Sequence, residues 1–164
     1  MTDRSLNQDR HLDEIARWAG YLGLLPFAAA LALAVMGATG FGGIDQSWAL
    51  SQAEALALAW GAIILTFVAA VHWGLALAGT WAWSIMSVLG SILPSVVALA
   101  ALLVQGVRGL ALLVAGFGLF WLYEHRFHAE HLSADYLTLR RHLTLSVSAL
   151  LVLTAFTLDA GARA

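Results

Sequence analysis

One histidine lies deep inside an apolar stretch, and it is the residue around which chemistry could be built. His72 occurs in Val71-His72-Trp73-Gly74, with no lysine, arginine or carboxylate for many positions on either side. Ionisable side chains inside a membrane mark functional sites more often than not. The imidazole could ligate a metal or haem, relay a proton, or hydrogen-bond a quinone. It could equally stay neutral and bridge two helices through a serine or a carbonyl.

Other polar breaks in the apolar sequence supply partners for this histidine. Ser91 and Ser95 flank Pro94, and a proline inside a helix frees the carbonyl four residues earlier, here that of Gly90, for a hydroxyl or the imidazole. We expect a polar cavity near the kinks at the two prolines, Pro26 and Pro94, opening toward the inner face of the membrane. Its expected lining residues are His72, Trp73, Ser91, Ser95, Glu124 and Arg140. The sequence requires no cofactor, and haem or quinone could bind there.

Glu124 and Arg140 are expected to form an ion pair. Both residues fall at the ends of neighbouring short apolar runs, where either charge alone would be costly to bury. The pair would act as a structural clamp between two helices. The alternative is that Glu124 transfers protons near His72.

Three histidines recur at every third position, as His125, His128 and His131. If the helix continues, Glu124, His128 and His131 share one face, and imidazole with carboxylate suits iron, copper and zinc. Membrane desaturases and hydroxylases use several separated histidine clusters, whereas here only His72 and His142 could assist. The alternative is that these histidines are ordinary polar residues on a solvated loop and bind no metal.

The composition identifies an integral membrane protein of one domain. Of its 164 residues, 61% are hydrophobic and 11% charged, whereas soluble domains are about 25% charged. The chain has no cysteine, which excludes disulfides and thiolate chemistry, and its eight basic residues are all arginine, which excludes a Schiff-base lysine. A net charge of −2 gives no reason to expect nucleic acid. The expected partners are the lipid bilayer and other membrane-protein subunits.

The apolar runs predict an all-α fold, an integral membrane bundle of five transmembrane helices. The expected helices cover residues 18–36, 55–78, 83–104, 110–126 and 142–158, which form the transmembrane domain 18–158. Residues 1–17 form a polar N-terminal segment and residues 159–164 a C-terminal tail. A tight turn through Gly79 and Thr80 makes the second and third helices antiparallel neighbours.

The arginines predict the orientation of this bundle. With five helices, one side carries Arg4, Arg10, Arg17, Arg126, Arg140 and Arg141, and the other carries Arg108 and Arg163. Because arginine is enriched on the cytoplasmic side, the N-terminus is expected inside and the C-terminus outside.

Several short motifs carry a family resemblance over about residues 17–158. They are Leu22-Gly23-Leu24-Leu25-Pro26-Phe27, Val71-His72-Trp73-Gly74-Leu75-Ala76, Leu93-Pro94-Ser95, Glu124, and Tyr136 with Leu139-Arg140 and Leu143-Thr144. Through them the chain resembles a membrane-protein family of unknown function (domain of unknown function 3429) that includes vertebrate transmembrane protein 69. It departs from the family pattern in having Glu124 for an aspartate, and in its three clustered histidines. The resemblance implies a multi-pass protein of a bacterial or mitochondrial inner membrane, and no established activity.

Three function classes follow. The chain is small and shows no complete catalytic constellation, which favours a non-enzymatic accessory or assembly factor for a larger membrane complex. The second class is a redox or cofactor-handling protein that binds haem, quinone or a metal through His72. The third is a small transporter, against which the lack of an internal repeat counts.

Overall fold

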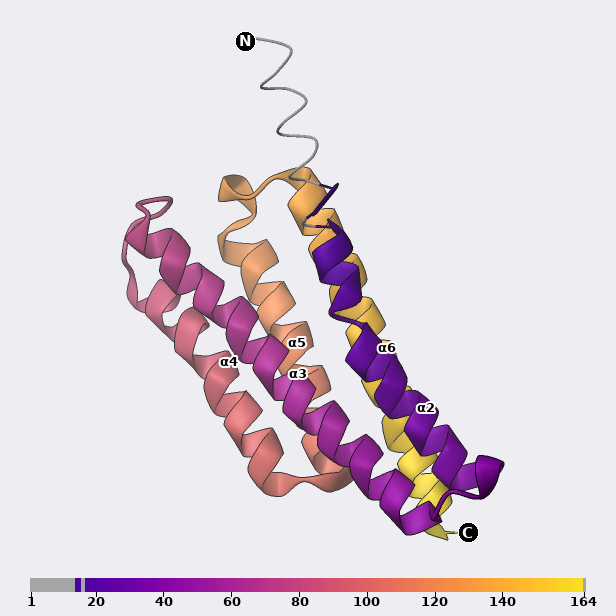
Figure 1. The fold of residues 1–164 in the computed structure, drawn as a ribbon. Helices are drawn as coiled ribbons and strands as arrows, with labels where there is room; N and C mark the ends of the chain where they lie inside the picture. The colour runs from indigo at the N-terminus through magenta and orange to yellow at the C-terminus, as the bar shows by residue number, and fades with distance from the viewer. Residues whose placement is uncertain (1–13, 16, 164) are drawn as a thin grey trace.

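The computed structural model describes residues 14–15 and 17–163, and this part of the chain is a bundle of helices (Figure 1). Within these described residues, five helices are long and apolar enough to cross a membrane. They comprise a first span, Arg17–Thr39, which includes α2 (Leu25–Thr39), then α3 (Gln46–Leu77), α4 (Ile85–Val104), α5 (Gly106–Phe127) and α6 (Ala134–Arg163). Short 3₁₀ turns, Phe41–Gly43 and Ala129–His131, lie in two of the links. The expected all-α bundle of five membrane-spanning helices is confirmed, while most of the predicted segment 1–17 lies outside the described residues.

Helix α3 is the centre of the bundle, since it packs against α2, α4, α5 and α6. The chain closes on itself because α6 returns beside α2 (Figure 1). Alanines fill much of the contact between helices and allow their backbones to approach closely; the buried ones include Ala30, Ala34, Ala53, Ala57, Ala62 and Ala69. The α3–α4 link, the α5–α6 link and the start of the first span lie at one end of the bundle, and the C-terminus lies at the other (Figure 1).

Helices α3, α5 and α6 extend beyond the apolar runs that predicted them, whereas α4 begins at Ile85 instead of residue 83. α3 begins at Gln46 instead of residue 55, because the side chain of Asp45 accepts the backbone N–H of Trp48 and caps the helix. α5 begins at Gly106 instead of residue 110. α6 covers Ala134–Arg163 instead of 142–158, so most of the expected tail 159–164 is helical. A helix can continue through polar residues near the membrane boundary. The length of an apolar run therefore indicates only the part of the helix that lies in the hydrocarbon core.

The first span is interrupted near Pro26, where a kink was expected. Residues 17–22 are helical, residues 23 and 24 form a turn, and α2 starts at Leu25. Pro26 therefore occupies the first turn of α2, where its missing N–H breaks no helical hydrogen bond. The indole N–H of Trp60 on α3 donates to the carbonyl of Gly23 at 2.9 Å. This bond gives the carbonyl of Gly23, which lies in the turn that interrupts the first span, a hydrogen-bond partner. It also connects this turn to the central helix α3.

Pro94 differs from Pro26 because it lies inside one continuous helix, α4. The hydroxyl of Ser91 donates to the carbonyl of Ser87 at 2.8 Å. Ser91 therefore does not serve the carbonyl of Gly90 that Pro94 frees. The α3–α4 turn is as expected: Gly79 has a positive φ of 76°, which glycine adopts without steric cost.

Candidate functional site

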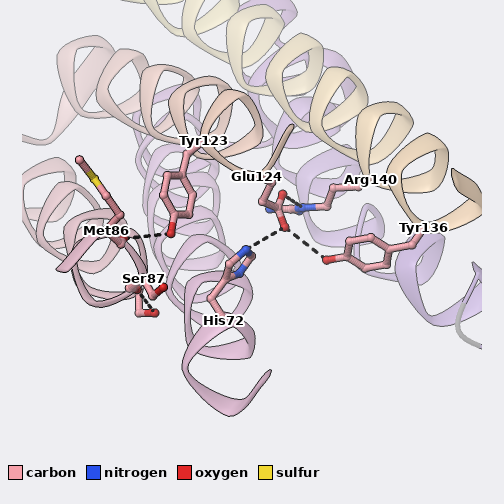
Figure 2. Close-up of polar contacts among 8 residues, drawn as sticks. His72, Met86, Ser87, Tyr123, Glu124, Tyr136 and Arg140 are labelled. Atoms are coloured by element: carbon pink, nitrogen blue, oxygen red, sulfur yellow. Dashed lines mark hydrogen bonds and ion pairs between the residues drawn. The ribbon is translucent and has the colours of Figure 1, made fainter. Parts of the chain in front are cut away.

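The carboxylate of Glu124 is the centre of a buried polar cluster (Figure 2). The Nε of Arg140 donates to its Oε2 at 2.8 Å, and the hydroxyl of Tyr136 donates to its Oε1 at 3.3 Å. The Nε2 of His72 lies 3.7 Å from the same Oε1. Glu124 is 0% exposed and Arg140 is 7% exposed. The cluster therefore joins α3, α5 and α6 at the end of the bundle where the α5–α6 link lies.

Local sequence positions these groups. Tyr136 and Arg140 are four residues apart on α6, so both point from one helical face toward α5. The guanidinium of Arg140 also lies over the ring of Phe120, with its Cζ 5.4 Å from the ring centroid. A buried carboxylate is costly unless it is paired and hydrogen-bonded. The expected Glu124–Arg140 ion pair is present and meets that requirement.

His72 is enclosed by aromatic rings and is only 1% exposed. Its ring centroid lies 5.0 Å from that of Phe120, 5.4 Å from Trp81, 5.9 Å from Tyr123 and 5.3 Å from His128. Among the described residues, no side chain forms a hydrogen bond with either ring nitrogen of His72. The imidazole thus faces the bundle interior, and a bulky ligand would have to displace these rings to reach it.

Among the described residues, no hydrogen bond joins Trp73, Ser91 or Ser95 to this cluster. Trp73 is 42% exposed and packs on Trp83, with ring centroids 5.0 Å apart. Ser95 is half-buried on α4, and no hydrogen bond between described residues joins it or Ser91 to Glu124. Helix α4 is linked to the site through Tyr123, whose hydroxyl donates to the carbonyl of Met86 at 2.9 Å (Figure 2).

The condition under which Glu124, His128 and His131 would share one helical face is not met, because α5 ends at Phe127. His125 is exposed and stacks on Trp121 with ring centroids 5.8 Å apart. His128 is buried against Trp81, with ring centroids 4.4 Å apart. The side chain of His131 lies outside the described part. Within the described residues no group of three histidine or carboxylate side chains is placed to hold a metal.

Sequence reasoning missed the aromatic neighbours of His72. Phe120 lies four residues before Glu124 and so shares its helical face, a signal that could have identified it. Trp81 carries no such signal, because its position depends on how the α3–α4 link folds back over the end of α3.

Two cavities lie along the bundle, and His72 lines neither of them. One, of about 500 Å³, is bounded by α5 and α6, with Asp159 at its edge. The other, of about 360 Å³, lies between the interrupted first span, α3 and α6, and includes Arg140 and Thr144 in its wall. Arg140 therefore contacts both the Glu124 cluster and a cavity.

Comparison with known proteins gives one match. No curated protein and no solved structure matches this chain. The family model described as "Protein of unknown function (DUF3429)" matches residues 12–156, which include all five membrane-spanning helices apart from the last residues of α6. The chain therefore belongs to the DUF3429 family of proteins of unknown function.

Proposed function

We propose that this protein is a non-enzymatic accessory or assembly factor that binds other subunits of a larger membrane complex. The observation that carries the proposal is that the carboxylate of Glu124 is 0% exposed, is paired with Arg140, and lines neither cavity. General acid–base catalysis needs a group within hydrogen-bond reach of a substrate. The cluster around Glu124 instead holds α3, α5 and α6 together. We therefore expect the outer faces of the bundle to bind the partner subunits.

Helix α4 offers an outer face suited to such binding. Its inner side carries small or compact residues that pack on the bundle, namely Ser87, Gly90, Ser91, Pro94, Ala98 and Ala101. Its exposed side carries Ile85, Leu89, Ile92, Val96, Leu99 and Leu103 at alternating spacings of four and three residues. That heptad spacing lets branched side chains interlock with a second helix in knobs-into-holes packing. We infer that α4 is the helix that meets a partner subunit.

Site-directed cross-linking in native membranes tests this proposal. The chain has no cysteine, so a single introduced cysteine carries a photoreactive label at one known place. Label at Ile92→Cys should give a discrete adduct with another membrane protein. The matched control is Leu153→Cys on α6, an apolar position with 52% exposure, which should not. Adducts at both positions that contain only lipid, or only a second copy of the chain, contradict the proposal.

Binding of haem, quinone or a metal through His72 has less support, because the rings of Phe120, Trp81 and Tyr123 enclose the imidazole. An absorption spectrum and metal analysis of the purified protein separate the two functions. A haem band that is lost on His72→Ala would favour the cofactor role over the accessory role.

The orientation with the N-terminus inside is part of the same proposal. Among the described residues, Arg17, Arg126, Arg140 and Arg141 belong to the end of the bundle with the α5–α6 link, and Arg108 and Arg163 belong to the other end. The positive-inside rule then favours the first end as cytoplasmic, or as the matrix side in a mitochondrion.

A further inference from the structure

The cavity beside Arg140 has mainly apolar walls. Its volume is about 360 Å³, at the lower end of the range for small-molecule sites, which is about 300–1,000 Å³. The apolar lining includes Phe27, Ile64, Phe67, Phe117, Leu143 and Val147. Phe67 is 64% exposed, so the wall of the cavity reaches the outer surface of the bundle. An apolar molecule could therefore enter it from the bilayer.

Two buried hydrogen-bond donors in the same wall are not used. The Nη2 of Arg140 and the Oγ1 of Thr144 make no hydrogen bond with any described residue, although the two residues are only 7% and 5% exposed. They lie four residues apart on α6, and both line the cavity. The bond from Nε of Arg140 to Glu124 fixes the guanidinium. Buried polar groups are normally satisfied, so these two neighbouring donors would gain hydrogen bonds if the side chains that cover them moved aside for an acceptor in the cavity.

The interruption of the first span borders the same cavity. Gly20, Gly23 and Leu24 belong to its lining, and residues 23 and 24 form the turn between helical segments. Irregular backbone at membrane depth is tolerated only where it is buried in protein or lines a cavity. The absence of a side chain at Gly20 lets Leu143 of α6 pack closely on the first span, since an added Cβ would lie 2.9 Å from its Cδ1.

We propose that this cavity binds a molecule with an apolar chain and a neutral carbonyl head, whose oxygen accepts hydrogen bonds from Nη2 of Arg140 and Oγ1 of Thr144. The apolar chain would lie along Phe27, Ile64 and Phe67. A neutral acceptor is favoured over an anion because Glu124 already neutralises Arg140, and a second negative charge would face that carboxylate. Such a carbonyl occurs in the ring of an isoprenoid quinone and in the ester of a bilayer lipid. The inference is independent of the proposed accessory role.

Binding to the delipidated full-length protein in detergent tests this site. The probes are a benzoquinone carrying one decyl chain, decylbenzene as the same chain without carbonyls, and phosphatidylcholine as the ester source. Native mass spectrometry counts the molecules bound per chain as each probe is titrated. We expect one benzoquinone or one phosphatidylcholine to bind saturably, and decylbenzene to bind more weakly. Competition between the first two shows which source is held more tightly.

The variants remove one donor at a time. Thr144→Val should weaken binding of the carbonyl probe about 3- to 10-fold, as expected for one lost neutral hydrogen bond. Arg140→Lys keeps a positive charge beside Glu124 but removes the fixed Nη2 donor, and it should weaken binding as well. The matched control is Thr154→Val on the same helix, because the hydroxyl of Thr154 already donates to the carbonyl of Leu150 and does not line this cavity. This variant should bind like the wild type.

The result that overturns the inference is equally specific. It is wrong if no carbonyl probe binds saturably, if decylbenzene binds as tightly as the benzoquinone, or if both donor variants bind like the wild type. A loss shared equally by Thr144→Val and Thr154→Val also contradicts it, because that pattern reports general loosening of α6.

Discussion

Arg140 on α6 and Glu124 on α5 meet in a buried ion pair, with Nε of the arginine 2.8 Å from Oε2 of the carboxylate. Glu124 lies near the end of α5 and Arg140 near the beginning of α6, so the pair connects two antiparallel helices close to their link. His72 of the central helix lies beside the same carboxylate. Three of the five helices thus meet at one buried carboxylate.

Gly90 is expected to be intolerant of even one added carbon. A Cβ at this position would overlap the ring of Tyr123, which is tied to α4 by its bond to Met86. We expect Gly90→Ala to lower the free energy of unfolding by about 1–3 kcal/mol, as for other overpacked interiors. Gly118→Ala on α5 is the control, because nothing lies within 4 Å of its added carbon. Denaturant unfolding in detergent measures both, and equal stability of the two variants would count against this packing.

Glu54 should stabilise the start of α5. Its Oε1 accepts the backbone N–H of Gly106 at 2.7 Å, and Gly106 follows Gln105, which has a positive φ of 57°. Glu54→Ala removes this acceptor and should cost about 1–3 kcal/mol. Glu54→Gln keeps a carbonyl oxygen and should cost less. Hydrogen exchange at the Gly106 amide provides the measurement. Equal protection in the wild type and Glu54→Ala would refute the role.

Asp45 makes the cap of α3 sensitive to acid. The hydroxyl of Ser47 and the backbone N–H of Trp48 donate to its carboxylate and hold the pKa of Asp45 below its ordinary value of 3.8. Because the pKa of Asp45 is lower in the folded than in the unfolded state, its ionised carboxylate stabilises the fold at pH values above the unfolded-state pKa. This contribution is lost as the pH falls through the folded-state pKa. Amides at the start of α3 should therefore lose protection in acid in the wild type. Asp45→Asn keeps an acceptor without a charge, so its protection should change less between pH 5 and pH 3.

The orientation of the bundle is tested by accessibility from either side. A cysteine placed at Ser47, in the first turn of α3, should react with an impermeant reagent added outside. A reporter fused after Ala164 should be active outside as well. Labelling of Ser47→Cys from the inside only, with a reporter active only on that side, would reverse the proposed orientation.

The five spans and the Glu124–Arg140 pair could be predicted because each rests on a local rule. An apolar run must span hydrocarbon, and two opposite charges at neighbouring helix ends must find each other. The start of α3 at Gln46 could not be found from apolar runs, since it depends on the Asp45 cap. The position of Trp81 beside His72 depends on the path of a link. The cavity at Thr144 could not be predicted either, because it depends on how the interruption of the first span is positioned next to α6. No local sequence pattern indicates that position.

A double-mutant cycle on the ion pair tests the central claim, that the buried charges hold the bundle together. Arg140→Ala leaves Glu124 buried without its partner and should lower the free energy of unfolding in detergent by about 3–5 kcal/mol. Adding Glu124→Gln removes the stranded charge, so the double variant should recover part of that loss. Strictly additive effects of the two substitutions would show that the side chains do not stabilise each other and would contradict the claim.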